Sequence, residues 1–116
     1  MVVFPNCKIN LGLSVTQKRD DGFHNIESVM YPVLLYDLLE IVQAPVKAFL
    51  FRCTGLELEG DLQNNLVVRA YSLLKEIYSL PEVHIHLHKI IPSGAGLGGG
   101  SSDAAFTIVL LNRLFK

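Results

Sequence analysis

One stretch of the sequence decides how the remainder is interpreted: Ile91-Pro92-Ser93-Gly94-Ala95-Gly96-Leu97-Gly98-Gly99-Gly100-Ser101-Ser102. Five of the nine glycines fall within it, and it lies between a strand-like run and an apolar, helix-like run. Glycine permits positive φ and lets a ligand approach bare amide groups, and a helix N-terminus carries about half a positive charge. Ser101 and Ser102 add hydroxyls that can cap the helix or bind phosphate. The stretch therefore predicts an anion site.

Two common phosphate-binding motifs do not fit this loop. A Walker A loop needs a lysine after glycine, and no lysine lies between Lys89 and Lys116. Gly94, Gly96 and Gly99 have the spacing of a dinucleotide fingerprint, but the loop lacks the long apolar strand before it and the βαβ unit after it. Glycine loops also serve as plain turns, so glycine content alone leaves both interpretations open.

Length and composition favour one globular domain. The 116 residues are 50% hydrophobic and 18% charged, and the net charge is −1. This balance argues against nucleic acid as a partner, because a phosphate backbone usually requires a basic excess. No apolar run reaches the ~20 residues that cross a bilayer, and no signal peptide is evident, so we expect a cytoplasmic protein without a membrane partner. Cys7 and Cys53 are expected to be reduced and buried.

Hydrophobic spacing predicts an α+β fold with a mainly antiparallel sheet and helices on one face. Period-2 alternation predicts a strand over 4–16, with Lys8 and Asn10 on one face. Asp20-Asp21-Gly22 predicts a turn. The other expected elements are two strands within 25–42 that meet around Tyr36-Asp37, a strand over 47–53, a loop over 54–62, a helix of about 14 residues capped by an asparagine at 64–65, a strand over 81–89 and a helix over 101–115.

Three titratable features each have a structural interpretation beside a functional one. His84, His86 and His88 alternate with apolar residues and could ligate zinc, but they span about 13 Å, so a partly covered sheet face is favoured. Lys89 precedes the loop and is interpreted as a surface lysine. Asp103 is expected in the first turn of its helix, where it suits the helix dipole but opposes a bound phosphate, so we expect its side chain to face away from the phosphates.

The run from Pro92 to Ala105 resembles the ATP-phosphate loop of the GHMP kinases, a family that includes galactokinase, homoserine kinase and mevalonate kinase. Two upstream segments add to the resemblance: Lys8-Ile9-Asn10-Leu11-Gly12-Leu13, and Arg19-Asp20-Asp21-Gly22-Phe23-His24. The family commonly has tyrosine where this chain has Phe23. Stacking on a base survives that change, whereas a bond from the phenol hydroxyl does not.

The resemblance implies roles for individual residues. Lys8 would be catalytic, supplying positive charge near the substrate hydroxyl or the transferred phosphoryl group. Asn10, Phe23 and His24 would bind the substrate, the last two holding a cytosine ring. ATP, with Mg²⁺, would be bound by Asn65 near the adenine and by the loop residues Pro92, Gly94, Gly96, Leu97, Gly98, Gly99, Gly100, Ser101 and Ser102. Asn65 is also a plain helix cap, and that alternative stays open.

The resemblance also implies a fold and an activity. The fold is that of the GHMP kinase N-terminal domain, similar to the second domain of ribosomal protein S5. Within the family the match is best for kinases that phosphorylate the 2-hydroxyl of a cytidyl-diphospho sugar alcohol in isoprenoid biosynthesis. We expect residues 1–116 to be a truncated N-terminal ATP-binding domain, without the C-terminal domain and inactive alone, because the family's Gly-Ala-Asp-[Val/Ile]-Pro segment does not occur in it. Another substrate, such as homoserine or mevalonate, and a non-catalytic nucleotide-binding remnant are the alternatives.

Overall fold

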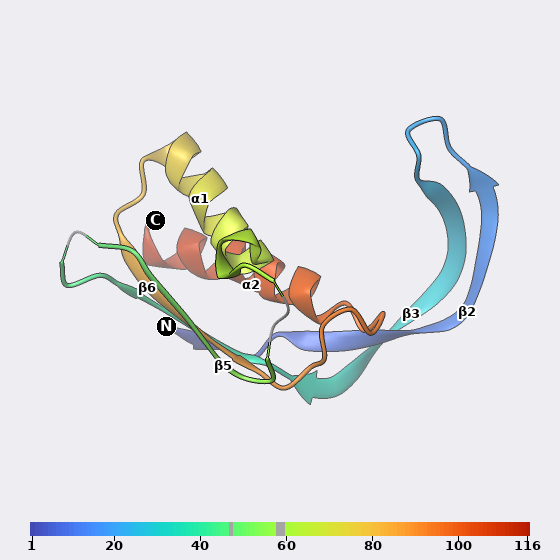
Figure 1. The fold of residues 1–116 in the computed structure, drawn as a ribbon, viewed down its shortest axis with the longest axis horizontal. Helices are drawn as coiled ribbons and strands as arrows, with labels where there is room; N and C mark the ends of the chain where they lie inside the picture. Colours follow the sequence, from blue (N-terminus) through green and yellow to red (C-terminus); the bar gives the residue numbers. More distant parts are fainter. Residues whose placement is uncertain (47, 58–59) are drawn as a thin grey trace.

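A computed structural model describes residues 1–46, 48–57 and 60–116 as one four-stranded sheet, one long hairpin and two helices (Figure 1). The strands are β1 (Val2–Val3), β2 (Asn6–Lys18), β3 (His24–Tyr36), β4 (Leu38–Gln43), β5 (Leu50–Gly55) and β6 (Val83–Lys89). The helices are α1 (Leu66–Tyr78) and α2 (Gly99–Leu114), with a short 3₁₀ turn, η1 (Leu62–Asn64), before α1. Lys47, at the start of the strand predicted over 47–53, and residues 58 and 59 of the predicted loop lie outside the described residues.

The main sheet has the strand order β1-β4-β6-β5. Its pairs are antiparallel except for β5 and β6, which run parallel and are connected through α1. This β5–α1–β6 crossover was not predicted, because the apolar alternation of β5 and β6 does not specify their relative direction. The predicted α+β class with a mainly antiparallel sheet is confirmed.

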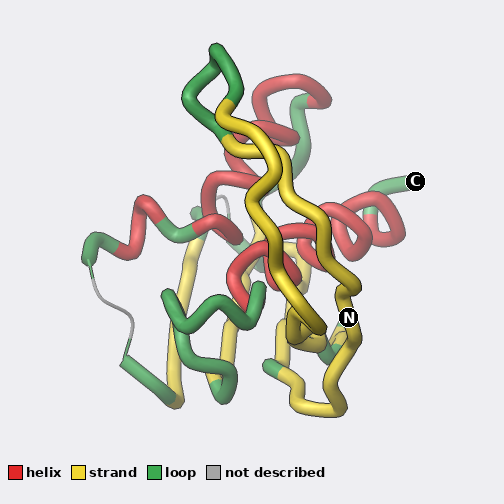
Figure 2. Tube along the Cα trace, turned by 90° about the vertical axis from the view of Figure 1, so that its right-hand side faces the viewer, coloured by secondary structure: helices red, strands yellow, loops and turns green. Residues whose placement is uncertain are grey.

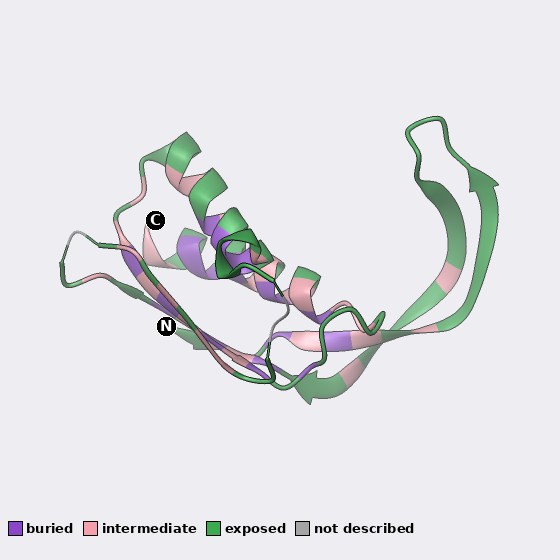
Figure 3. Cartoon of the chain, viewed as in Figure 1, coloured by how far each residue is buried: buried purple, intermediate pink, exposed green. Residues whose placement is uncertain are grey.

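Both helices lie on the same face of this sheet, and the hydrophobic core lies between the helices and the sheet (Figure 3). The alternation predicted for the last strand is exact: Val83, Ile85 and Leu87 are buried in the core, and the histidines between them are half-buried on the opposite face. α1 and α2 contribute the other side of the core through residues that recur at helical spacing, namely Val67, Tyr71, Leu110 and Leu111.

β2 and β3 form a separate two-stranded hairpin that we call the arm. The arm extends away from the helices and curves, and its strands run side by side to a tight turn at the tip (Figures 1 and 2). At this turn Gly22 has φ +85° and the Phe23 amide donates to Asp21 Oδ1 (3.1 Å), as the Asp-Asp-Gly signal predicted. Most arm side chains are exposed, whereas Cys7 at the base is buried. Both cysteines are free, as predicted, although Cys53 is only half-buried.

Candidate nucleotide-binding site

The glycine loop connects β6 to α2, and its backbone has a repeating left-handed conformation. Gly94, Gly96 and Gly98 have φ of +72°, +74° and +70°. L-residues adopt such values only with strain, and so glycine is required at these alternate positions. Successive amides in a chain of this kind turn toward a common concave side, which is an arrangement that suits an anion.

The N-terminus of α2 continues this arrangement and has no side-chain cap. α2 begins at Gly99, two residues earlier than predicted, with Gly98 in the capping position. Ser101 and Ser102 therefore lie inside the helix, and the prediction that they could cap it is wrong. The first intrahelical bond runs from the Ser102 amide to Gly98 O (3.0 Å), so the amides before it have no partner within the helix. These uncapped amides and the helix dipole are left for a ligand.

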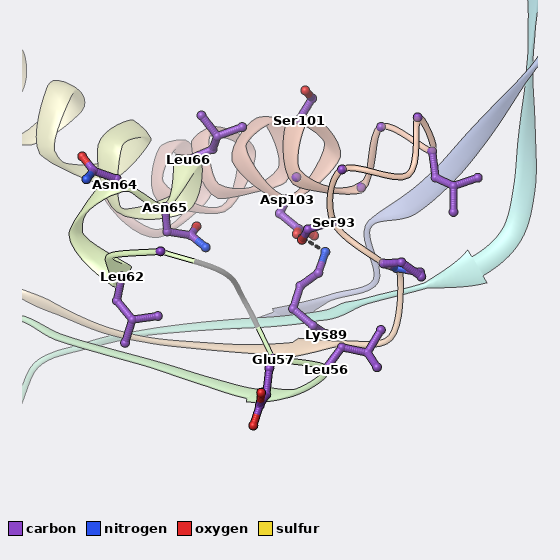
Figure 4. Close-up of a pocket in the computed structure, with 18 of the residues that line it drawn as sticks. Leu56, Glu57, Leu62, Asn64, Asn65, Leu66, Lys89, Ser93, Ser101 and Asp103 are labelled. Atoms are coloured by element: carbon purple, nitrogen blue, oxygen red, sulfur yellow. Dashed lines mark hydrogen bonds and ion pairs between the residues drawn. The ribbon is translucent and has the colours of Figure 1, made fainter.

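A cleft of about 910 Å³ opens beside the loop. One wall is the loop and the first turn of α2, and the facing wall is η1 and the start of α1 (Figure 4). The lining includes most loop residues assigned to ATP and also Asn65: Asn65, Pro92, Gly94, Gly96, Leu97, Gly98, Gly99, Gly100 and Ser101. Ser102 does not line it. Leu56, Leu62 and Leu66 provide apolar surface within the cleft, which suits a flat base.

Asn65 caps α1 and also faces the cleft. Its Oδ1 accepts from the Val67 amide (2.9 Å), which confirms the cap, and the same residue ends η1. Because the oxygen is occupied, the amide NH₂ is the group that could contact a ligand. The two interpretations of Asn65 are thus compatible.

Lys8 joins the arm to the loop. Its Nζ donates to Gly96 O (2.8 Å) and its backbone amide donates to Leu97 O (2.9 Å). A Cβ on Gly98 would lie 3.2 Å from Lys8 Cε, so the lysine stem packs directly on the loop. The structure therefore brings together Lys8 and the loop, which are more than 80 residues apart in the sequence.

The predicted substrate residues lie along the arm. Asn10 is two residues beyond Lys8 on the same strand and accepts from Ser28 Oγ (3.3 Å). Phe23 and His24 lie at the tip, where Phe23 is 72% exposed. Figure 1 shows the tip at the far end of the arm from the helices, so the chain does not bring Phe23 and His24 to the loop.

Beneath the N-terminus of α2 lies a buried group of charges. Lys89 is only 2% exposed, so its prediction as a surface lysine is wrong. Its Nζ donates to Asp37 Oδ2 (2.5 Å) and to Asp103 Oδ2 (2.8 Å), the second of which is drawn in Figure 4. Because α2 starts early, Asp103 lies just beyond its first turn and binds Lys89 below the helix. Sequence reasoning missed Asp37; the available signal was a single charge between two apolar runs, 33–35 and 38–39.

These contacts shift two pKa values. Burial alone would lower the pKa of Lys89, but its bonds to Asp103 and Asp37 outweigh burial, and the pKa lies above its usual value. Burial, helped by the nearby Asp37, raises the pKa of Asp103 to about 6 against the opposing effect of Lys89. Asp103 Oδ1 is buried without a hydrogen-bond partner, which also favours the protonated form.

The histidine row on the other face of the sheet shows no metal cluster. Thr54 Oγ1 hydrogen-bonds to His86 Nε2 (2.8 Å) and His88 Nδ1 (2.9 Å). Within 1–46, 48–57 and 60–116, no three or more His, Cys, Asp or Glu side chains are grouped so that they could hold a metal ion. Among the same residues, no helix is long and apolar enough to cross a membrane.

Comparison with known proteins agrees with this geometry. Residues 65–116, which contain α1, β6, the loop and α2, match the family described as "GHMP kinases N terminal domain". This part of the chain is similar to the GHMP kinases. The GHMP assignment accounts for the glycine loop, the uncapped helix and the cleft together.

Two sequence relatives share one name. The chain is 57% identical to a 4-diphosphocytidyl-2-C-methyl-D-erythritol kinase of Bacteroides thetaiotaomicron, with 100% of the chain and 43% of the relative aligned. It is 58% identical to the protein of that name from Cytophaga hutchinsonii, with 99% of the chain and 42% of the relative aligned. The chain thus spans less than half the length of these curated relatives.

Solved structures give the same fold. A crystal structure of 4-(cytidine 5'-diphospho)-2C-methyl-D-erythritol kinase superimposes with a TM-score of 0.81 and 38% identity, covering 99% of this chain and 41% of that one. The homoserine kinase of Cytophaga hutchinsonii superimposes with a TM-score of 0.62 over 73% of this chain and 29% of that one. At 21% identity this second likeness indicates a shared fold only.

Proposed function

We propose that residues 1–116 are the nucleotide-binding domain of an ATP-dependent kinase that phosphorylates the 2-hydroxyl of 4-diphosphocytidyl-2-C-methyl-D-erythritol. One observation carries the nucleotide assignment: the uncapped N-terminus of α2 continues a left-handed glycine loop and opens into a cleft of about 910 Å³. The names of the sequence relatives support the choice of substrate.

Phosphoryl transfer depends mostly on positioning and charge neutralisation, and the described residues supply both. The loop and helix amides would hold the triphosphate, and the apolar side of the cleft near Leu62 and Leu66 would hold the base. Lys8 lies against the loop, where its ammonium could leave the Gly96 carbonyl for a phosphoryl oxygen. Mg²⁺ usually binds ATP through phosphate oxygens and few protein ligands, which fits a cleft whose described residues form no group of three or more His, Cys, Asp or Glu side chains that could hold a metal ion.

The cytidyl substrate would lie along the arm. Phe23 offers an exposed ring for stacking on cytosine, and His24 is also exposed beside it. Asn10 lies between this tip and Lys8 and would hydrogen-bond the substrate near the reacting hydroxyl. Residues outside 1–116 would supply the aspartate that orients this hydroxyl, since more than half of each relative lies outside the aligned region.

The nucleotide assignment is tested by comparing two glycine variants under calorimetric titration with ATP. Gly96→Ala and Gly12→Ala impose similar strain, because both glycines have φ near +70° and neither Cβ would contact another atom. Gly96→Ala should weaken ATP binding by about tenfold or more, since its methyl group would enter the space for phosphate. Gly12→Ala, on the arm, should leave ATP affinity unchanged. Equal ATP affinity of both variants and the unmodified chain would contradict the assignment.

Substrate and activity need separate measurements. CMP should bind, and His24→Ala should remove that binding without changing ATP affinity; an absence of CMP binding would favour another substrate within the family. The 116-residue chain alone should show little or no turnover of the cytidyl substrate. Turnover near that of full-length relatives would refute the need for residues outside 1–116.

A further inference from the structure

Asp37 lies at the junction of three parts of the chain. It is fully buried in the turn between β3 and β4, and its amide donates to Pro5 O (2.9 Å) at the start of the arm. Its Oδ1 accepts from the amides of Ile90 (2.6 Å) and Ile91 (2.9 Å), the first residues after β6. One carboxylate oxygen therefore fixes the point at which the glycine loop begins.

The other oxygen of Asp37 reaches α2 through Lys89. The Lys89 ammonium is held between Asp37 Oδ2 and Asp103 Oδ2, and it is directly below the start of the helix. A Cβ on Gly99 would lie only 3.4 Å from Lys89 Nζ and 2.8 Å from Ile91 Cγ2, so the loop closes tightly over this group. Asp37, Lys89 and Asp103 thus connect the turn between β3 and β4, β6 and α2 under both ends of the loop.

These contacts occupy donors that would otherwise be available to a phosphate. Lys89 lines the cleft, but its charge is balanced by two carboxylates, and the amides of Ile90 and Ile91 are used by Asp37. The amides left for an anion are those beyond Pro92 and at the start of α2. Burying three charged groups is a weak route to stability, because well-packed apolar side chains are often as stabilising as a buried ion pair. Stability alone does not explain the group.

We propose that Asp37 is a positioning residue for the nucleotide site: through two loop amides and Lys89, it holds the glycine loop and the N-terminus of α2 in the arrangement that binds the triphosphate. This inference rests on the proposed nucleotide site, but it adds a residue outside the loop, one that lies neither in the glycine motif nor among the residues that line the cleft. Asp37 acts on the loop without touching the ligand.

The test uses Asp37→Asn, which preserves the side-chain shape and an oxygen for the two amides but removes the charge that holds Lys89. Two controls lie on β4, the strand that follows Asp37. Glu40→Gln removes a carboxylate that pairs with neither Lys89 nor the loop, and Ile41→Val trims a buried core side chain without a change of charge. ATP affinity is measured by calorimetry in buffer without denaturant, in which each variant is folded. Backbone amide resonances of 93–102 are recorded by NMR without nucleotide.

Asp37→Asn should weaken ATP binding by about tenfold and move the amide resonances of the loop, whereas both controls retain affinity and loop resonances. The NMR comparison needs no ligand, so it separates the two proposals. If the unmodified chain fails to bind ATP while Asp37→Asn still moves the loop resonances, the nucleotide assignment falls and the positioning role stands. Unchanged loop resonances with unchanged ATP affinity would overturn the positioning role. If Asp37→Asn does not fold, Lys89→Gln is compared in the same way, and the same outcomes decide.

Discussion

Two neighbouring glycines at the start of α2 should respond in opposite ways to the same substitution. Gly99 and Gly100 are consecutive helical residues, so alanine at either position gains the same intrinsic helix preference. Their surroundings differ. A Cβ on Gly99 would lie 2.8 Å from Ile91 Cγ2 and 3.2 Å from Ile91 Cβ, whereas a Cβ on Gly100 would have its nearest neighbour, Leu66 Cδ1, at 3.7 Å.

The magnitude follows from this difference. Ordinary contact begins near 3.4 Å, so Gly99→Ala requires a shift of about 0.6 Å between α2 and the fully buried Ile91. Overpacking of this kind costs about 1–3 kcal/mol. Gly100→Ala meets only ordinary contact and should stabilise by about 0.5 kcal/mol through helix preference and reduced unfolded-state entropy. The two variants should therefore differ by about 1–3 kcal/mol, with Gly99→Ala the less stable.

Urea unfolding followed by circular dichroism measures both changes, provided that the slope m is the same in each variant. A double-mutant cycle with Ile91→Ala identifies the cause, because removal of Cγ2 relieves the contact. Gly99→Ala and Ile91→Ala should then be less than additive by about 0.5 kcal/mol or more, whereas Gly100→Ala and Ile91→Ala should add. Equal stability of the two single variants would refute the close approach of α2 to Ile91.

Three further predictions concern the cap, the buried charges and the arm. Asn65→Ala should lower the free energy of unfolding by about 1 kcal/mol through loss of the bond to the Val67 amide, and Asn65→Asp should retain it; urea unfolding distinguishes them. Because the folded chain holds the Asp103 proton to about pH 6 and the unfolded chain releases it near 3.8, the contribution of this group to stability should fall as pH rises from 4 to 6, by at most about 3 kcal/mol. Asp103→Asn should remove that component of the pH profile; an identical profile would contradict the raised pKa. Phe23→Ala should change stability by less than about 0.5 kcal/mol because the ring is exposed, yet weaken CMP binding, and a loss of stability with unchanged CMP affinity would argue for a packing role.

The local elements were predictable because their signals lie within a few residues. Strict alternation over 83–88 specifies a strand with one buried face, and Asn65 followed by apolar residues at helical spacing specifies the start of α1. The glycine loop was also predictable as an anion site, since the need for positive φ at Gly96 and its neighbours is a property of the residue type. The resemblance of this loop to the ATP-phosphate loop of the GHMP kinases indicated ATP as the ligand.

Tertiary structure alone decided the contacts between distant residues. Lys89 has the sequence context of a surface lysine, and only the approach of Asp37 and Asp103 from two other elements makes its burial possible. The parallel pairing of β5 with β6 and the contact of Lys8 with Gly96 likewise depend on how the chain returns on itself. The sequence by itself determined the type of most helices, strands and turns, because those depend on neighbours along the chain. Which charges meet under the loop was determined only by packing, because that pairing joins residues as many as 52 positions apart.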